Sequence, residues 1–244
     1  MDLTGSPQRL YLFQLGTSTM PTPQRTIVMS SGCYLVQTNA DENILIDSGL
    51  PPDYTPPPGT PETEHSTNVI RCLRDIGLDP GDIDTVICTH FDIDHVGHHR
   101  SFPTAEFIVQ REHYELARAG HPRFAATSRY WDDPRFHFRL VDGDVDLVPG
   151  LTVVKTPGHA PAHQSVLVRL PETGSVLLAI DAVMMSWLFT VDRVAWPMDD
   201  NEAELRASTQ KLLDMAERES VALVIFGHDG EQWKSLTKAP GYYA

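Results

Sequence analysis

Short apolar runs separated by polar turns recur along the whole chain and predict a protein rich in β-strands. In the first half, three runs follow one another and predict an antiparallel hairpin system; they cover residues 10–15, 33–38 and 44–49. Two more strands of this half are predicted at residues 85–89 and 107–110. The second half repeats the theme, with predicted strands at residues 151–156, 165–170, 175–180 and 222–226.

Apolar residues at helical spacing mark several segments between these strands. The first helix is expected to take Ser66 or Thr67 as its N-cap and to stop at Gly77. Two further helices are expected at residues 111–119 and 202–219. The second of these should bury four side chains, those of Leu205, Leu212, Leu213 and Ala216. Two strand-rich halves that each carry helices predict an α/β protein folded as a four-layer αββα sandwich, whose strand-end loops meet along one edge.

Two segments show neither the strand period nor the helix period. Residues 50–63 contain six prolines, which remove backbone donors, so we expect a surface loop that could cover a pocket. Residues 121–136 contain aromatic side chains without regular spacing, and they predict either a loop over the core or one wall of a substrate site. Arginines in and near this segment are interleaved with acidic and aromatic residues and are interpreted as solvated; they are Arg123, Arg129, Arg135 and Arg139.

Composition and charge limit the classes of function. The chain has 244 residues, 41% of them hydrophobic, and a net charge of −14, which predicts one globular domain over residues 1–244 and argues against nucleic-acid or anionic-membrane surfaces. Neither a signal-peptide pattern nor an apolar stretch approaching about eighteen residues is visible, so no membrane partner is expected. Cys33, Cys72 and Cys88 lie in apolar segments without CxxC spacing, which predicts core thiols and a cytoplasmic protein. Homo-oligomer formation is left open.

The strongest chemical signal follows the predicted strand at residues 85–89. His90, Asp92, Asp94 and His95 bring two imidazoles and two carboxylates together directly after this apolar run. Burying such groups costs free energy unless a metal or hydrogen bonds compensate for the lost water. The pattern therefore favours a metal site, and a polar loop with solvated histidines is the alternative that this segment alone leaves open.

Three more potential ligands follow predicted strands of the second half: His159, Asp181 and His228. Asp181 comes directly after an apolar run, so its carboxylate needs a strong partner. Together with the first four residues they suit two divalent metal ions, because seven side chains are too many for one tetrahedral ion. Asp47, at the end of another predicted strand, is either a plain turn residue or a hydrogen-bond partner of a ligand histidine.

The motif His90-x-Asp92-x-Asp94-His95 resembles the His-x-His-x-Asp-His signature of the metallo-β-lactamase fold superfamily. Further segments are similar to those of its quorum-quenching family, the N-acyl homoserine lactone lactonases; they are residues 33–36, 46–49, 156–165, 175–182 and 226–232. The resemblance spans nearly the whole chain and implies the metallo-β-lactamase fold. It also implies one ion held by His90, Asp92 and His159, a second held by Asp94, His95 and His228, and Asp181 bridging the two.

The same resemblance implies a reaction. The chain is expected to be a metal-dependent hydrolase, a lactonase acting as a carboxylic ester hydrolase. It would open the ring of an N-acyl homoserine lactone or a related lactone by attack of a metal-bridging hydroxide. Asp94 is the candidate proton shuttle. The cofactors would be two divalent ions, with zinc the first expectation and manganese or iron open because Asp92 offers oxygen. A small-molecule lactone is the expected partner.

Two departures from the family pattern affect the site. Asp92 stands where the family has its second histidine, and from the sequence alone Asp92→His is expected to keep both ions. Met184 stands where the family has an active-site tyrosine, and a thioether cannot donate that hydrogen bond. Tyr54 or Tyr130 could replace it from a loop. Three neighbouring histidines are not expected to be ligands: His98 and His99, interpreted as loop residues, and His163, interpreted as structural or as a partner of a ligand.

Other functions stay open. Hydrolysis of another ester or thioester would use the same chemistry. Flavodiiron proteins of the same superfamily place a glutamate at the position of Asp92, so a di-iron redox protein is an alternative, although no flavodoxin-like segment accompanies it here. A non-catalytic ligand-binding or scaffold protein is the remaining alternative, and the retention of seven ligating side chains argues against it.

Overall fold

The first of two mixed sheets contains the strands of the N-terminal half. The protein is described here by a computed structural model covering residues 3–22, 25–55 and 63–244. The order in this seven-stranded sheet is β4-β1-β2-β3-β5-β6-β7. The bounds are β1 Pro7–Pro21, β2 Thr26–Thr38, β3 Asn43–Ile46, β4 Thr63–His65, β5 Thr85–Ile87, β6 Glu106–Gln110 and β7 His137–Val141. β1, β2 and β3 pair antiparallel, as the sequence predicts, whereas β3, β5, β6 and β7 are parallel.

The second sheet has five strands in the order β12-β11-β10-β9-β8. The bounds are β8 Val145–Val148, β9 Leu151–Lys155, β10 Gln164–Leu170, β11 Gly174–Ile180 and β12 Leu223–Phe226. β8 to β11 pair antiparallel, and β12 joins β11 in parallel. The apolar residues that face inward from both sheets form one central core, which includes Leu12, Ile46, Val166 and Leu178. Burial of this shared apolar surface holds the two sheets together.

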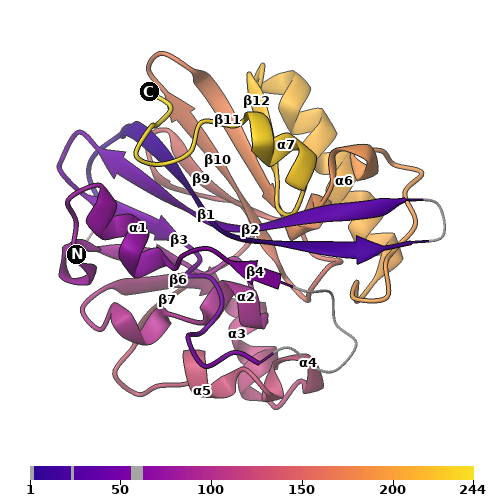
Figure 1. Ribbon diagram of the computed structural model, residues 1–244, viewed down its shortest axis with the longest axis horizontal. Helices are drawn as coiled ribbons and strands as arrows, with labels where there is room; N and C mark the ends of the chain where they lie inside the picture. The colour runs from indigo at the N-terminus through magenta and orange to yellow at the C-terminus, as the bar shows by residue number, and fades with distance from the viewer. Residues whose placement is uncertain (1–2, 23–24, 56–62) are drawn as a thin grey trace.

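Helices cover the outer faces of the two sheets, so the predicted four-layer αββα sandwich is confirmed (Figure 1). On the first sheet lie α1 Val69–Asp75, α2 Ile93–Val96, α3 Arg111–Arg118, α4 Pro122–Ala125 and α5 Ser128–Trp131. On the second lies α6 Glu202–Arg218, whereas α7 Gly230–Ser235 packs against β2 and contributes Trp233 to the central core. Short 3-10 turns add η1 Pro80–Asp82, η2 His99–Ser101, η3 Asp181–Val183 and η4 Ser186–Leu188. Within the described part of the chain, no helix is long and apolar enough to cross a membrane.

The helix predictions hold with two corrections. The N-cap of α1 is Asn68, whose side chain accepts from the Arg71 N–H, rather than Ser66 or Thr67. Gly77 stops this helix as predicted, with a φ of 83°. In α6, Leu205 and Leu212 are buried as predicted, but Leu213 and Ala216 are only partly buried, and the third buried apolar side chain is that of Met215.

The irregular segments also contain more structure than the sequence predicts. The segment 121–136 contains α4 and α5, and its aromatic residues Phe124, Trp131 and Phe136 are buried in the core under the first sheet. The proline-rich loop lies partly outside the described residues, and its positions 50–55 are neither helix nor strand. β1 and β2 run well past the predicted strands and form the long two-stranded ribbon that Figure 1 shows extending from the sandwich.

Candidate metal centre

All seven predicted ligand residues lie together, each close behind the end of a strand. Residues 90–95 follow β5, His159 follows β9, Asp181 follows β11 and His228 follows β12. The chain between β12 and His228 must pass close to the Asp181 carboxylate, and a Cβ at Gly227 would lie only 2.6 Å from Asp181 Oδ1. The Gly-His sequence is therefore a steric requirement at this position.

The first group of ligand atoms has the spacing that one metal ion needs. Asp92 Oδ2 lies 3.4 Å from His90 Nε2 and 3.4 Å from His159 Nε2. Asp181 Oδ2 lies 3.7 Å and 3.3 Å from the same two nitrogens. Zinc–nitrogen and zinc–oxygen bonds of roughly 2.0–2.1 Å in a tetrahedron put neighbouring ligand atoms about 3.3 Å apart. These spacings are close to those around one tetrahedral ion. Arg123 Nη2 lies 2.5 Å from Asp92 Oδ2 and 3.0 Å from His159 Nε2, so the guanidinium would have to shift for both atoms to bind an ion.

The second group has the same geometry. Asp94 Oδ2 lies 3.7 Å from His95 Nε2 and 3.7 Å from His228 Nε2. Asp181 Oδ2 lies 3.4 Å and 3.2 Å from these nitrogens. Asp181 Oδ2 is thus near all four histidine nitrogens, as a carboxylate shared by two ions must be. The structure groups His90, His159 and Asp181 on one side and Asp94, His95 and His228 on the other, with ligand atoms within 4.8 Å of one another.

Two buried nitrogens in these groups need a partner that protein atoms do not supply. His90 Nε2 and His95 Nε2 have no hydrogen-bond partner among the residues that the structure describes. Burial lowers the pKa of His90 to about 3, so its ring is neutral near pH 7. The Thr89 hydroxyl donates to Asp47 and therefore accepts from His90 Nδ1, which leaves the lone pair on Nε2. An orphaned buried acceptor is costly unless a ligand compensates for it. The donor set therefore fits divalent metal.

Each ligand histidine is oriented through its other ring nitrogen. His95 Nδ1 donates to Asp47 Oδ2 at 2.7 Å, which settles the open question about Asp47 in favour of a hydrogen-bond partner. His90 Nδ1 lies 3.0 Å from Thr89 Oγ1, whose hydroxyl donates to Asp47 Oδ2 at 2.7 Å. The remaining two rings have oxygen partners of their own: Asp199 Oδ1 lies 2.8 Å from His159 Nδ1, and the Ser30 carbonyl lies 2.9 Å from His228 Nδ1. These contacts point Nε2 of each ring into the centre.

Two of these orienting residues were not found from the sequence. Asp199 lies in the turn before α6, with a fully buried side chain, and its other oxygen accepts from the Trp196 N–H at 2.7 Å. Ser30 lies in the part of β2 that precedes the predicted strand, and it acts through its backbone carbonyl. Sequence spacing carries no signal for either contact, because the partners are 40 and 198 positions apart.

One arginine, interpreted from the sequence as solvated, is part of the centre. Arg123 Nε donates to Asp92 Oδ1 at 2.8 Å and Arg123 Nη2 to Asp92 Oδ2 at 2.5 Å. Its side chain is 18% exposed, whereas that of Arg135 is 65% exposed. Burial would raise the pKa of the Asp92 carboxyl, but His90, His159 and Arg123 hold that pKa well below its usual range. Asp92 is therefore a carboxylate near neutrality.

The neighbouring histidines differ in role. His99 is not an ordinary loop residue: its ring is fully buried, with Ser48 Oγ 2.8 Å from Nδ1 and Cys88 Sγ 3.1 Å from Nε2. His163 is structural as expected, with Nδ1 2.9 Å from Thr156 Oγ1. His98 does lie in a loop, but it is buried and lines a pocket.

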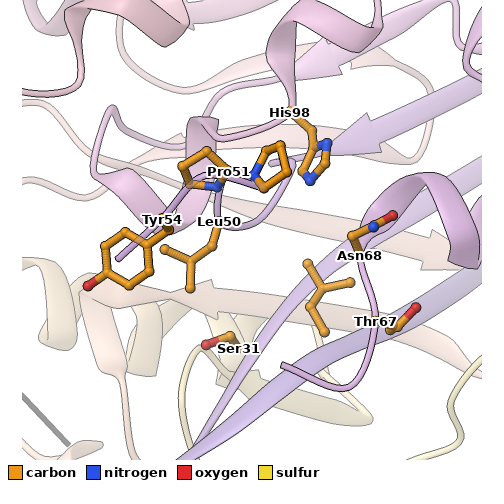
Figure 2. Close-up of a pocket in the computed structure, with 9 residues that line it drawn as sticks. Ser31, Leu50, Pro51, Tyr54, Thr67, Asn68 and His98 are labelled. Atoms are coloured by element: carbon orange, nitrogen blue, oxygen red, sulfur yellow. The ribbon is translucent and has the colours of Figure 1, made fainter. Parts of the chain in front are cut away.

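That pocket lies beside the second ligand group. It has a volume of about 250 Å³ and is lined by residues from β1, β2, the loop after β3 and the start of α1. Figure 2 shows Tyr54 and Leu50 on one side of it and Thr67 and Asn68 on the other. Ser31 lines both this pocket and the small cavity against Asp94 and His228. A small molecule in the pocket would therefore lie next to the metal centre.

Of the tyrosines considered as substitutes for the family residue at Met184, only one is well placed. Met184 itself is fully buried in the core between α6 and the second sheet, and its carbonyl accepts from the His228 N–H at 2.9 Å. Tyr130 donates its hydroxyl proton to Asp53 at 2.9 Å. Tyr54 lines the pocket, and burial together with the charge of Asp94 raises its pKa, so its phenol keeps the proton.

Comparisons with known proteins agree with this fold. Residues 27–228 match the metallo-beta-lactamase superfamily. An N-acyl homoserine lactonase of Bacillus thuringiensis is 31% identical over 235 residues, which cover 91% of this chain and 90% of that protein. The N-acyl homoserine lactonase AttM of Azorhizobium caulinodans is 38% identical over 203 residues, covering 75% of this chain and 72% of that protein.

Superposition on solved structures supports the same family and fold. An N-acyl homoserine lactone hydrolase with N-hexanoyl-L-homoserine bound at its catalytic metal centre superposes with a TM-score of 0.85 at 28% identity, covering 98% of this chain and 100% of that one. AidC, a dizinc quorum-quenching lactonase, shares the fold with a TM-score of 0.69 at 19% identity, over 89% of this chain and 79% of that one. The chain therefore belongs to the metallo-beta-lactamase superfamily and, within it, to the family of the N-acyl homoserine lactonases.

Proposed function

We propose that this protein is a metal-dependent hydrolase that opens the ring of an N-acyl homoserine lactone or a related lactone. The observation that carries the proposal is the double ligand group, with Asp181 Oδ2 within 3.7 Å of four histidine nitrogens. The similarity to named lactonases over about nine-tenths of both chains supports the choice of a lactone among ester substrates. One core shared by both sheets supports treating residues 1–244 as a single hydrolase domain.

The proposed cofactors are two divalent ions, with zinc first. His90, Asp92 and His159 would hold one, Asp94, His95 and His228 the other, and Asp181 would bridge them. Bound ions of this kind supply an activated water at neutral pH and polarise the ester carbonyl. Oxygen from Asp92 leaves manganese or iron open. The near-tetrahedral spacing of the ligand atoms of His90, His159 and Asp181 supports zinc, because zinc accepts this geometry readily.

The remaining roles belong to residues of the protein itself. Asp94 is the proposed proton shuttle to the departing ring oxygen, and its side chain is 27% exposed toward the pocket side of the centre. Tyr54 is the proposed donor to the carbonyl oxygen in place of the family tyrosine, because its phenol stays protonated beside Asp94. Asp47 and Asp199 keep the ligand rings in the tautomer that presents Nε2. The free, buried state of all three cysteines supports a cytoplasmic location.

Ring opening releases a proton, so a weakly buffered indicator assay tests the proposal. Metal-loaded protein should release protons from N-acyl homoserine lactones and from other γ- and δ-lactones, and a chelator should abolish the release. Aryl esters, thioesters and phosphodiesters form the comparison panel. Turnover of those substrates with no metal-dependent release from any lactone would replace the lactonase proposal with the broader ester or thioester alternative.

A further inference from the structure

The ion pair between Asp92 and Arg123 differs from the other arginine–carboxylate pairs of the protein in where it lies. Both guanidinium contacts to Asp92 are direct, at 2.8 Å and 2.5 Å, and one of the two oxygens is the atom that faces His90 and His159. Asp92 is only 22% exposed. A two-pronged guanidinium contact fixes a carboxylate in position and in rotation, which a single hydrogen bond does not do.

Arg123 is itself held in place by the turn that orients His159. Its Nη1 donates to the Met198 carbonyl at 2.7 Å, and the next residue, Asp199, is hydrogen-bonded to His159 Nδ1. Arg123 Nη2 also lies 3.0 Å from His159 Nε2, so it contacts both of the atoms that Asp92 and His159 would offer to an ion. The guanidinium therefore joins three separate segments: the turn after β5, α4 and the turn before α6. An exposed ion pair contributes little to stability, but an ion pair anchored at both ends can set the geometry of a metal ligand.

Charge gives the pair a second consequence. A carboxylate at residue 92 adds one negative charge compared with the neutral imidazole of the family motif, and Arg123 adds one positive charge in contact with it. The two residues together thus have the same net charge as a histidine. Counting Asp92 without Arg123 therefore overestimates the negative charge of the centre.

We propose that Arg123 is a positioning residue of the metal centre, which orients Asp92 as a ligand and compensates its charge, so that Asp92 and Arg123 act as one unit. The inference rests on the proposed metal centre but not on the choice of lactone as substrate. It also revises the expectation from the sequence that Asp92→His keeps both ions. In that variant the guanidinium would face two ions and three imidazoles without its carboxylate.

Metal affinity measured by competition with a chromophoric zinc chelator tests the proposal directly. Arg123→Met removes the charge and the hydrogen bonds while keeping a long apolar stem. It should lower the affinity for one of the two zinc ions by about 10–100-fold. Arg123→Lys keeps the charge but loses the two-pronged contact, so its zinc affinity should lie between those of Arg123→Met and the unaltered protein. The matched control is Arg135→Met, since Arg135 makes the same two-pronged contact to Asp133 on the surface. That variant should bind zinc like the unaltered protein.

The decisive comparison is a cycle with Asp92→His. Alone, Asp92→His should weaken zinc binding; combined with Arg123→Met, it should bind more tightly than Asp92→His alone, because the uncompensated guanidinium is gone. The double variant also guards against misfolding, since its recovery requires a folded chain. The proposal would be overturned if the losses of zinc affinity caused by Asp92→His and by Arg123→Met simply added up in the double variant. Zinc binding by Arg123→Met that matches the Arg135→Met control would also overturn it, as would a second ion gained in Arg123→Met, which would mean that the guanidinium excludes metal. None of these outcomes depends on lactone turnover.

Discussion

Replacing Asp47 by Asn should weaken the binding of both proposed metal ions, although Asp47 is not among their proposed ligands. As a carboxylate, Asp47 can only accept hydrogen bonds. Its Oδ2 accepts from His95 Nδ1 and from the Thr89 hydroxyl, each at 2.7 Å, and that hydroxyl in turn lies 3.0 Å from His90 Nδ1. The chain of contacts therefore keeps the proton on Nδ1 of one ligand histidine in each group and leaves both Nε2 lone pairs for metal.

An amide reverses this preference while keeping the backbone intact. Asp47 has a φ of 60°, a left-handed conformation that Asn adopts nearly as well as Asp. The Asn amide nitrogen would face His95 Nδ1 as a donor, so the ring would move its proton to Nε2 and lose its lone pair there. Partners of metal-bound histidines contribute roughly 10–100-fold in affinity, which corresponds to about 1.4–2.7 kcal/mol for each ion.

Zinc competition with a chelator measures this loss, and thermal unfolding of the metal-free protein provides the control. Burial raises the pKa of Asp47 despite the contacts from His95 and Thr89, so removing its charge should change the metal-free melting temperature by no more than about 4 °C. Asp84→Asn, at an aspartate that caps the Asn43 N–H far from the ligands, should leave zinc affinity unchanged. Two ions bound by Asp47→Asn with unaltered affinity would refute the tautomer argument.

Three further outcomes follow from the same contacts. Asp199→Asn should weaken only the ion at His159, because Asp199 orients that ring alone; chelator competition showing equal loss of both ions would contradict this. Burial lowers the pKa of His113 to about 4, against about 6.5 unfolded, so only the unfolded chain gains a proton between these values and stability falls as pH drops. Urea unfolding of metal-free protein should show about 2 kcal/mol less stability from this group at pH 5 than at pH 7, and His113→Gln should lack that loss. Zinc at about 100 times its dissociation constant should raise the melting temperature by roughly 5–10 °C per site, which a chelator should reverse.

The ligands could be predicted because local sequence carries their signal. An apolar strand followed at once by an imidazole or carboxylate, as at His90 and Asp181, indicates a polar group that the fold must bury and compensate. Several such strand ends meet at one place in any sandwich of this kind, so the clustering of the seven candidate ligands and the order of the layers followed from the sequence.

Apart from Asp47, the residues that orient the candidate ligands could not be predicted from the sequence, since tertiary packing sets these contacts. Arg123 belongs to a segment without periodicity, and its contact with Asp92 spans 31 positions. His99 has the sequence context of a loop, yet its ring is buried between Ser48 and Cys88, which follow β3 and β5. A charged or polar side chain in an irregular segment gives no sign of its exposure until the packing is known.

Titration of metal-free protein with zinc, with proton release from an N-acyl homoserine lactone followed at each addition, tests the central claim most directly. Activity should climb until two equivalents of zinc are bound per chain and then level off. Full activity at one equivalent would contradict the double ligand group as the catalytic centre, and two bound ions without ring opening would contradict the lactonase function.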